Sequence, residues 1–186
     1  MPRKRRILKE HILNAALELI KVEGFNQFTA RRIAEYLNAS TQPIYKEFKN
    51  MEDLKENLID YVKEIIQRDV FKISDQDIHL KDVCANYIRF AKEEGILFRA
   101  LFMGGEIPAS SLHECTFYSL NQVMDQMEEL DSKNSAEKQA IIDAIWPSIH
   151  GMAVLTAQGQ YYYSEKEIVD KTDRIVSQSL VAWENV

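Results

Sequence analysis

The sequence predicts an all-α protein of about nine helices, and three observations predict it. Apolar residues recur at spacings of three and four along most of the chain, as on one face of a helix. No stretch alternates apolar and polar residues as a half-buried strand does. Only 6 glycines and 4 prolines occur in 186 residues, which disfavours turn-rich all-β architectures.

The first three predicted segments are separated by turn residues. Residues 4–22 have one apolar face and predict an amphipathic helix that Gly24 ends. Thr29 can cap a short second helix through its side-chain oxygen. Asn38 then favours a sharp turn, because asparagine tolerates left-handed backbone angles.

Further predicted helix caps follow the turn at Asn38. Ser40 can cap a third helix, which places Pro43 in the first turn, where a missing N–H costs little. Asn50 followed by Asp53 predicts the start of a fourth helix. Ser111 with Glu114 and Ser164 with Glu167 have the spacing of capping boxes. The remaining predicted segments are 80–91, 96–103, 111–130, 135–160 and 164–183.

Charge is distributed unevenly between the two ends of the chain. Residues 1–50 contain ten basic and five acidic residues, whereas the whole chain has a formal charge of −6. The first fifty residues therefore carry +5 and the remainder −11. A basic head on an acidic body indicates that a polyanion would contact the head alone, although a solvated basic tail without a partner gives the same count.

Residues 29–49 contain two short predicted helices joined by a tight turn, which is a helix-turn-helix pattern. The second helix of such a pair can enter the major groove of DNA while the first supports it. Glutamine can pair with adenine, and threonine or proline can contact a thymine methyl group. Hydroxyl and basic side chains suit phosphates. The predicted DNA-binding residues are Thr29, Arg31, Ser40, Thr41, Gln42, Pro43, Tyr45, Lys46 and Lys49. Ile44 and Phe48 are expected in the core.

These residues also carry a family resemblance. Thr29-Ala30-Arg31-Arg32-Ile33-Ala34, Ile44-Tyr45 and Phe48-Lys49-Asn50, within residues 7–54, resemble the DNA-binding domain of tetracycline-repressor (TetR/AcrR) transcriptional regulators. The resemblance implies a homodimer that reads the two half-sites of a near-palindromic operator in double-stranded DNA, and most often a repressor. Met51 and the acidic Glu47 depart from the family pattern.

The acidic remainder resembles the ligand-binding and dimerisation domain of the same family. Trp146 followed by His150-Gly151 is similar to the Trp-His-Gly pattern of one subgroup, in which the last two helices form a four-helix interface. The expected domains are residues 1–50 for DNA binding and 51–186 for ligand binding and dimerisation. The expected interface residues are Ile149, Gly151, Met152, Ala153, Ile175, Leu180 and Trp183. A monomer that buries these residues internally is the alternative.

Aromatic residues at helical spacing suggest either a core or an apolar ligand pocket for an unidentified small-molecule effector. The candidate ligand-binding residues are Tyr87, Phe98, Phe102, Phe117, Tyr118, Trp146 and His150. His150 on an apolar face is more often a satisfied core histidine than a ligand contact. Cys84 and Cys115 are expected as packing residues, with a thiol sensor as the alternative.

Several function classes are disfavoured. The chain has no glycine-rich phosphate loop, no H-E-x-x-H and no G-x-S-x-G, so we expect neither an enzyme nor a cofactor. The scattered histidines do not predict a metal site. No apolar run reaches the roughly 18 residues of a membrane span, and charges interrupt any signal-peptide core, so a cytoplasmic location is expected. A helical adaptor that binds another protein is the alternative function.

Overall fold

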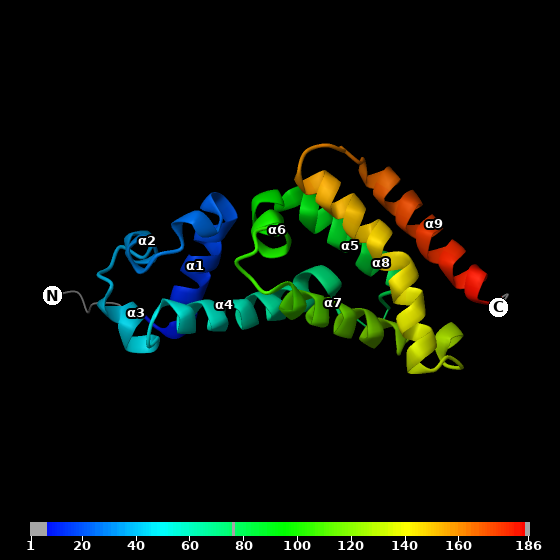
Figure 1. Ribbon diagram of the computed structural model, residues 1–186, viewed down its shortest axis with the longest axis horizontal. Coiled ribbons are helices and arrows are strands. Elements are labelled where there is room, and N and C mark those ends of the chain that lie inside the picture. The colour runs from blue at the N-terminus through cyan, green and yellow to red at the C-terminus, as the bar shows by residue number, and fades with distance from the viewer. Residues whose placement is uncertain (1–6, 76, 185–186) are drawn as a thin grey trace.

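The computed structural model describes residues 7–75 and 77–184, and this part of the chain contains nine α-helices and no strand. The all-α prediction is confirmed. The helices are α1 (Lys9–Glu23), α2 (Ala30–Tyr36), α3 (Gln42–Glu47), α4 (Met51–Ile65), α5 (Leu80–Glu93), α6 (Gly95–Phe102), α7 (Ala109–Met124), α8 (Ser135–Ala157) and α9 (Glu165–Glu184). In Figure 1, α1 to α3 lie at one end of the molecule, α4 leads away from them, and α5 to α9 form the body.

The predicted caps and turns of the first helices are present, with one correction. The Thr29 hydroxyl accepts a hydrogen bond from the Arg32 N–H at 3.2 Å, and Asn50 Oδ1 accepts one from the Asp53 N–H at 2.9 Å. Gly24 and Asn38 adopt positive φ angles of 68° and 50°, as the turns require. Ser40 does not cap α3, because this helix begins after Thr41 without a side-chain cap bond.

Helix boundaries differ from prediction where packing or turn geometry decides them. The first helix begins at Lys9, and the predicted residues 4–6 lie outside the described part. The seventh begins at Ala109 after Pro108, so the expected Ser111 cap does not form. It ends at Met124, and Glu128–Leu130 form a separate 3₁₀ turn instead of its last turn. The Ser164–Glu167 box does form, with a backbone-to-carboxylate bond of 2.8 Å.

The fourth helix continues into the body through a π-helical segment, Ile66–Phe71. Lys72 ends this segment with a left-handed backbone angle, φ 52°. The extra residue per turn in a π-helix rotates the apolar face. Here Ile66, Val70 and Phe71 are all buried, so the segment holds α4 against the body.

The body is built around α5, which packs against α8, α9 and α7. Its Val83, Cys84, Tyr87 and Ile88 are fully buried. In Figure 1, α8 and α9 run side by side and are joined by the loop that follows Ala157. The core therefore extends from the long fourth helix to the paired last helices.

In the described part of the chain, α8 is the single helix long and apolar enough to cross a membrane by length and composition. Three of its isoleucines, Ile141, Ile145 and Ile149, are at most 1% exposed. Because they pack into the protein core against the neighbouring helices, burial within the protein accounts for this apolar face.

Candidate nucleic-acid interface

The second and third helices form a helix-turn-helix supported by α1. Ile33 and Ala34 of α2 and Ile44 of α3 are 0–3% exposed and share one core with Ile12 and Ala16 of α1. Phe48, which follows α3, is 2% exposed and joins the same core. The expected core roles of Ile44 and Phe48 are confirmed, so α3 buries one face and leaves the other to solvent.

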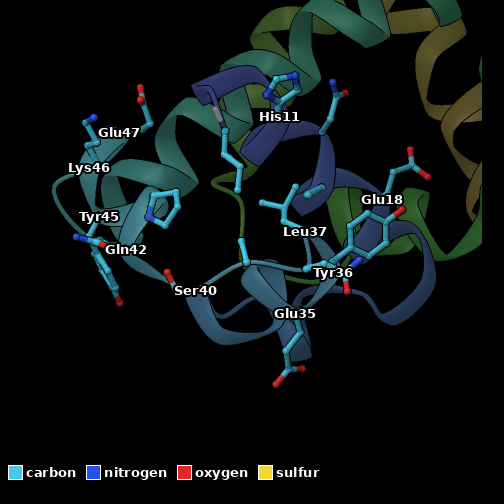
Figure 2. Close-up of a pocket in the computed structure, with 16 residues that line it drawn as sticks. His11, Glu18, Glu35, Tyr36, Leu37, Ser40, Gln42, Tyr45, Lys46 and Glu47 are labelled. Carbon is cyan, nitrogen blue, oxygen red and sulfur yellow. The ribbon is translucent and has the colours of Figure 1, made fainter. Parts of the chain in front are cut away.

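The solvent face of α3 presents three residues predicted to bind DNA. Gln42 and Lys46 are exposed, and Tyr45 is 53% exposed. Figure 2 shows their side chains projecting from α3 on one side of the helix-turn-helix. A polar amide, a phenol and a cation on one exposed helix face can reach base edges and phosphates together.

The remaining predicted residues surround this face. Thr29, Ser40 and Lys49 are exposed, whereas Thr41 and Pro43 are half-buried at the start of α3. The backbone N–H of Lys49 donates a hydrogen bond to the Asp53 carboxylate at 2.8 Å. Because this bond does not involve the side chain, the Lys49 ammonium group can still contact a phosphate. Thr29 accepts the cap bond of α2 but still has a hydroxyl hydrogen to donate.

Both arginines of α2 contact acidic residues. Arg31 Nε lies 3.0 Å from Glu35, and Arg32 Nη1 lies 2.9 Å from the same carboxylate. Arg32 also pairs with Glu23 at the end of α1. Hydrogen bonds from Arg32 and then Arg31 lower the pKa of Glu35, which stays ionised at neutral pH. Arg32 therefore joins α1 to α2, while Arg31, whose side chain is 86% exposed, can also reach a phosphate.

Contacts that sequence reasoning missed fix the helix-turn-helix on α4. The Lys9 ammonium group donates to Asn57 and lies 5.6 Å from the centre of the Phe48 ring. The Tyr61 hydroxyl donates to Asn14. These partners are 39 to 48 residues apart in sequence, so no local pattern predicts them. They join α1, and through Phe48 the end of α3, to α4.

A concavity of about 1750 Å³ lies between α1 and the turn that joins α2 to α3. His11 and Glu18 line its α1 side, and Tyr36, Ser40 and Tyr45 line the other side. Figure 2 shows Glu18 and Tyr36 on the side away from Lys46. Gln42 and Lys46 of α3 line the same concavity, so its α3 side carries a cation that can contact a phosphate.

Comparison with known proteins agrees with this geometry. Residues 12–58 match the family described as bacterial regulatory proteins, tetR family. This segment is TetR-like. It covers α1 to α3 and the first half of α4, which are the elements that build and orient the helix-turn-helix. No curated protein matches the chain.

Solved structures share the overall fold of the chain. One is described as a TetR-family regulator from Vibrio parahaemolyticus, with 18% identity, a TM-score of 0.64, and 93% of this chain and 96% of that chain covered. A TetR-like transcriptional regulator from Rhodococcus sp. RHA1 has 15% identity, a TM-score of 0.64, and 96% and 99% covered. The dihydroxyacetone kinase operon activator DhaS has 14% identity, a TM-score of 0.60, and 95% and 96% covered. These likenesses show a shared fold.

In the body, six of the seven candidate ligand residues meet in one aromatic cluster. Tyr87 lies at its centre, with ring centroids 4.7 Å from Trp146, 5.4 Å from Phe98 and 5.5 Å from Phe102. Phe117 joins through Trp146 at 6.4 Å. Tyr118 does not join, because its side chain is 56% exposed and accepts a hydrogen bond from Gln122. The rings pack on one another, and none of them lines the concavity beside α3.

His150 belongs to the same cluster and has a hydrogen-bond partner. Its Nδ1 lies 3.0 Å from the Tyr87 hydroxyl. Burial, followed by the nearby His113, lowers the pKa of His150, so the neutral form is favoured. Burial raises the pKa of Cys84 to about 12 and also raises that of Cys115. Thiolate is the reactive form, so both cysteines suit packing better than redox sensing.

The expected interface residues lie on two sides of the last two helices. Gly151, Met152, Ile175 and Leu180 are partly exposed on α8 and α9. Ile149 and Ala153 are 0% exposed in the single chain, because their face of α8 packs into the chain's own core. These two residues therefore pack inside the protomer instead of facing a partner. The side chain of Trp183 lies outside the described part.

Proposed function

We propose that this protein is a cytoplasmic, homodimeric transcriptional regulator that binds double-stranded DNA at a near-palindromic operator and responds to a small molecule, most simply as a repressor. One observation carries the proposal. The third helix buries Ile44 against the core and leaves Gln42, Tyr45 and Lys46 to solvent, which is what a recognition helix requires.

Charge supports the same proposal. The first fifty residues carry +5 and the rest −11, so DNA would be attracted to the helix-turn-helix end and repelled by the body. We place the domain division between residues 50 and 51. The fourth helix begins there and connects the two parts.

Dimerisation would use the outer faces of α8 and α9. Val169 is 46% exposed on α9, and Ile175 and Leu180 lie partly exposed further along the same helix. A second copy would cover these apolar side chains. Two recognition helices held in this way would read half-sites about one DNA turn, roughly 34–36 Å, apart.

The response to an effector would be a population shift. A ligand can lower the affinity for DNA only as far as it binds the DNA-incompetent arrangement more tightly. Contacts between α1 and α6 connect the helix-turn-helix to the body, so a ligand in the body could change the angle of the recognition helix.

Selection of bound fragments from random duplex DNA, followed by titration against salt, tests this proposal. Phosphate contacts release counterions, so the affinity should fall steeply as salt rises. Tyr45→Ala and Lys49→Ala should lose operator binding and keep the dimer. Tyr118→Ala, at a tyrosine of similar exposure (56% against 53%) on α7, is the matched control and should bind normally.

The same experiment distinguishes the alternative function. A helical adaptor would select no duplex sequence at low salt, and that result would overturn the proposal. Because the structurally similar DhaS is an operon activator, a reporter assay should record both an increase and a decrease in transcription.

A further inference from the structure

A second concavity lies where the helix-turn-helix end meets the body. It has a volume of about 360 Å³, within the range of roughly 300–1,000 Å³ that small-molecule sites occupy. Its walls come from α1, the end of α4 with its π-helical continuation, α5 and α6. Leu17 of α1, Val70 of the π-helical segment and Leu97 of α6 form part of an apolar floor.

Most charged groups at the rim of this pocket are already paired. Lys21 of α1 lies 2.9 Å from Glu18 and 3.9 Å from Glu94. Asp69 pairs with Arg68 at 2.7 Å. Together these five groups carry a net charge of −1, so they add little net charge to the mouth of the pocket.

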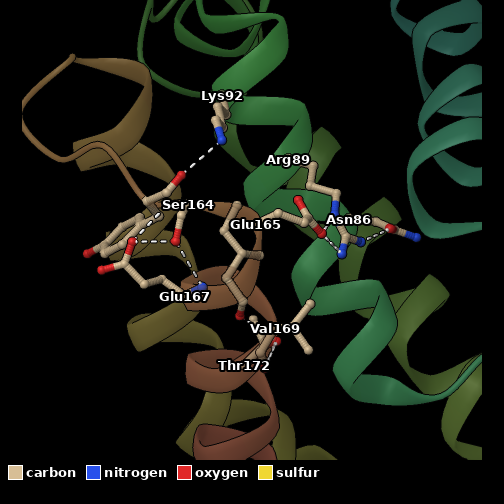
Figure 3. A network of polar contacts seen from close by, with 10 residues as sticks. Asn86, Arg89, Lys92, Ser164, Glu165, Glu167, Val169 and Thr172 are labelled. Atoms are coloured by element: carbon tan, nitrogen blue, oxygen red, sulfur yellow. Dashed lines mark hydrogen bonds and ion pairs between the residues drawn. The ribbon is translucent and has the colours of Figure 1, made fainter.

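Two rim charges and some hydrogen-bonding capacity remain. In residues 7–75 and 77–184, the side chains of Lys72 and Glu93 have no ion-pair or hydrogen-bond partner. Arg89 uses Nε and Nη2 for Glu165 and Nη1 for Asn86, as Figure 3 shows. A guanidinium group has five N–H donors, so two are still available.

The remaining groups are complementary to a ligand with two opposite charges. Glu93 follows Arg89 by four residues on α5 and therefore lies on the same face one turn later. Lys72 and the spare N–H groups of Arg89 can donate hydrogen bonds to a carboxylate, and Glu93 can accept hydrogen bonds from an ammonium group. The apolar floor suits a hydrocarbon or aromatic side chain.

We propose that this interdomain pocket binds a small amphipathic zwitterion, of the class of an α-amino acid with an apolar side chain. The carboxylate lies against Lys72 and Arg89, the ammonium group against Glu93, and the side chain on the apolar floor. The inference rests on the proposed ligand response. It places the effector site at the junction between the domains instead of in the packed aromatic cluster. Because Leu17 and Lys21 belong to α1, this ligand contacts the DNA-binding end directly.

Titration calorimetry of the full chain with three matched probes tests the head-group chemistry. L-Phenylalanine has both charges, 3-phenylpropionate has the carboxylate alone, and 2-phenylethylamine has the ammonium group alone. A hydrogen-bonded charge pair lost from the site should weaken binding roughly tenfold or more. L-Phenylalanine should therefore bind best. No saturable binding of L-phenylalanine, or equal binding of a one-charge probe, would overturn the proposal.

Two variants test the location. Glu93→Gln and Lys72→Gln remove the unpaired charges while keeping similar size, and each should weaken L-phenylalanine binding about tenfold. Glu129→Gln and Lys166→Gln make the same chemical changes at exposed residues outside the pocket and should leave binding unchanged. Undiminished binding in both pocket variants places the ligand elsewhere and refutes the assignment.

Circular dichroism spectra of all four variants should match that of the native chain, so a loss of binding is not a loss of fold. These titrations contain no DNA. A negative result in these titrations therefore does not contradict DNA binding by the helix-turn-helix. A negative result in the operator experiment does not contradict ligand binding in the pocket, which the calorimetry tests separately.

Discussion

Thr29→Ala tests both the local structure and the proposed interface. The Thr29 hydroxyl accepts the N–H of Arg32 at 3.2 Å and so caps α2, a helix of seven residues. Loss of a threonine cap costs about 1 kcal/mol, within a range of roughly 0.5–2 kcal/mol. For a chain of 186 residues each kcal/mol corresponds to a change of about 2–4 °C in the melting temperature. We expect Tm to fall by about that much.

The same hydroxyl has a second expected role, because it can donate its hydrogen to a DNA phosphate while it accepts the cap bond. Thr29→Ser keeps both abilities and should preserve stability and operator affinity. Asn50→Ala removes the comparable cap of α4, whose hydrogen bond is 2.9 Å, and should lower Tm similarly. Operator affinity should fall more in Thr29→Ala than in Asn50→Ala.

Thermal melting followed by circular dichroism gives the first quantity, and titration of labelled operator DNA at fixed salt gives the second. A Thr29→Ala chain that melts at the native temperature would refute the cap argument. Equal operator affinities for Thr29→Ala and Asn50→Ala, measured well below both melting temperatures, would remove Thr29 from the phosphate contacts.

Three further predictions follow from burial and protonation. Ile44→Ala, at a residue 1% exposed, should lower the free energy of unfolding by about 2–5 kcal/mol in denaturant titration, whereas Tyr45→Ala should leave it nearly unchanged. Burial lowers the pKa of His150 in the folded chain, so the unfolded chain binds a proton at this histidine more readily. The free energy of unfolding should therefore decline as the pH falls below the ordinary histidine pKa of about 6.5. It should level off once the pH is below the pKa of the folded chain. His150→Gln should flatten that part of the stability profile, and an unchanged slope would contradict the assignment. Ile175→Glu on α9 should shift sedimentation from dimer toward monomer, and an unaltered dimer would remove this face from the interface.

Local patterns in the sequence were enough for the helix-turn-helix. Thr29, Gly24, Asn38 and Asn50 act through the backbone of their own or neighbouring turns, so their positions in the chain determine their roles. The 3.6-residue period likewise separated Ile44 from Tyr45, because adjacent residues on a short helix face different directions.

Local patterns failed where a choice depended on a distant partner. The sequence showed that α8 is apolar over much of its surface, but Ile149 is buried within the protomer whereas Gly151 is partly exposed. The position of α5 decides between these faces. The start of α3 after Thr41, in place of the expected Ser40, was likewise not predicted, because no side-chain cap bond forms there to mark the boundary.

The sequence by itself determined an all-α chain with a basic helix-turn-helix and a set of apolar helix faces, because helix periodicity, caps and net charge are properties of neighbouring residues. Only the tertiary structure decided which faces meet, that six aromatic candidates pack together, and that a pocket opens between α1 and α5. Those outcomes depend on side chains dozens of residues apart, and packing of complete helices alone brings such side chains into contact.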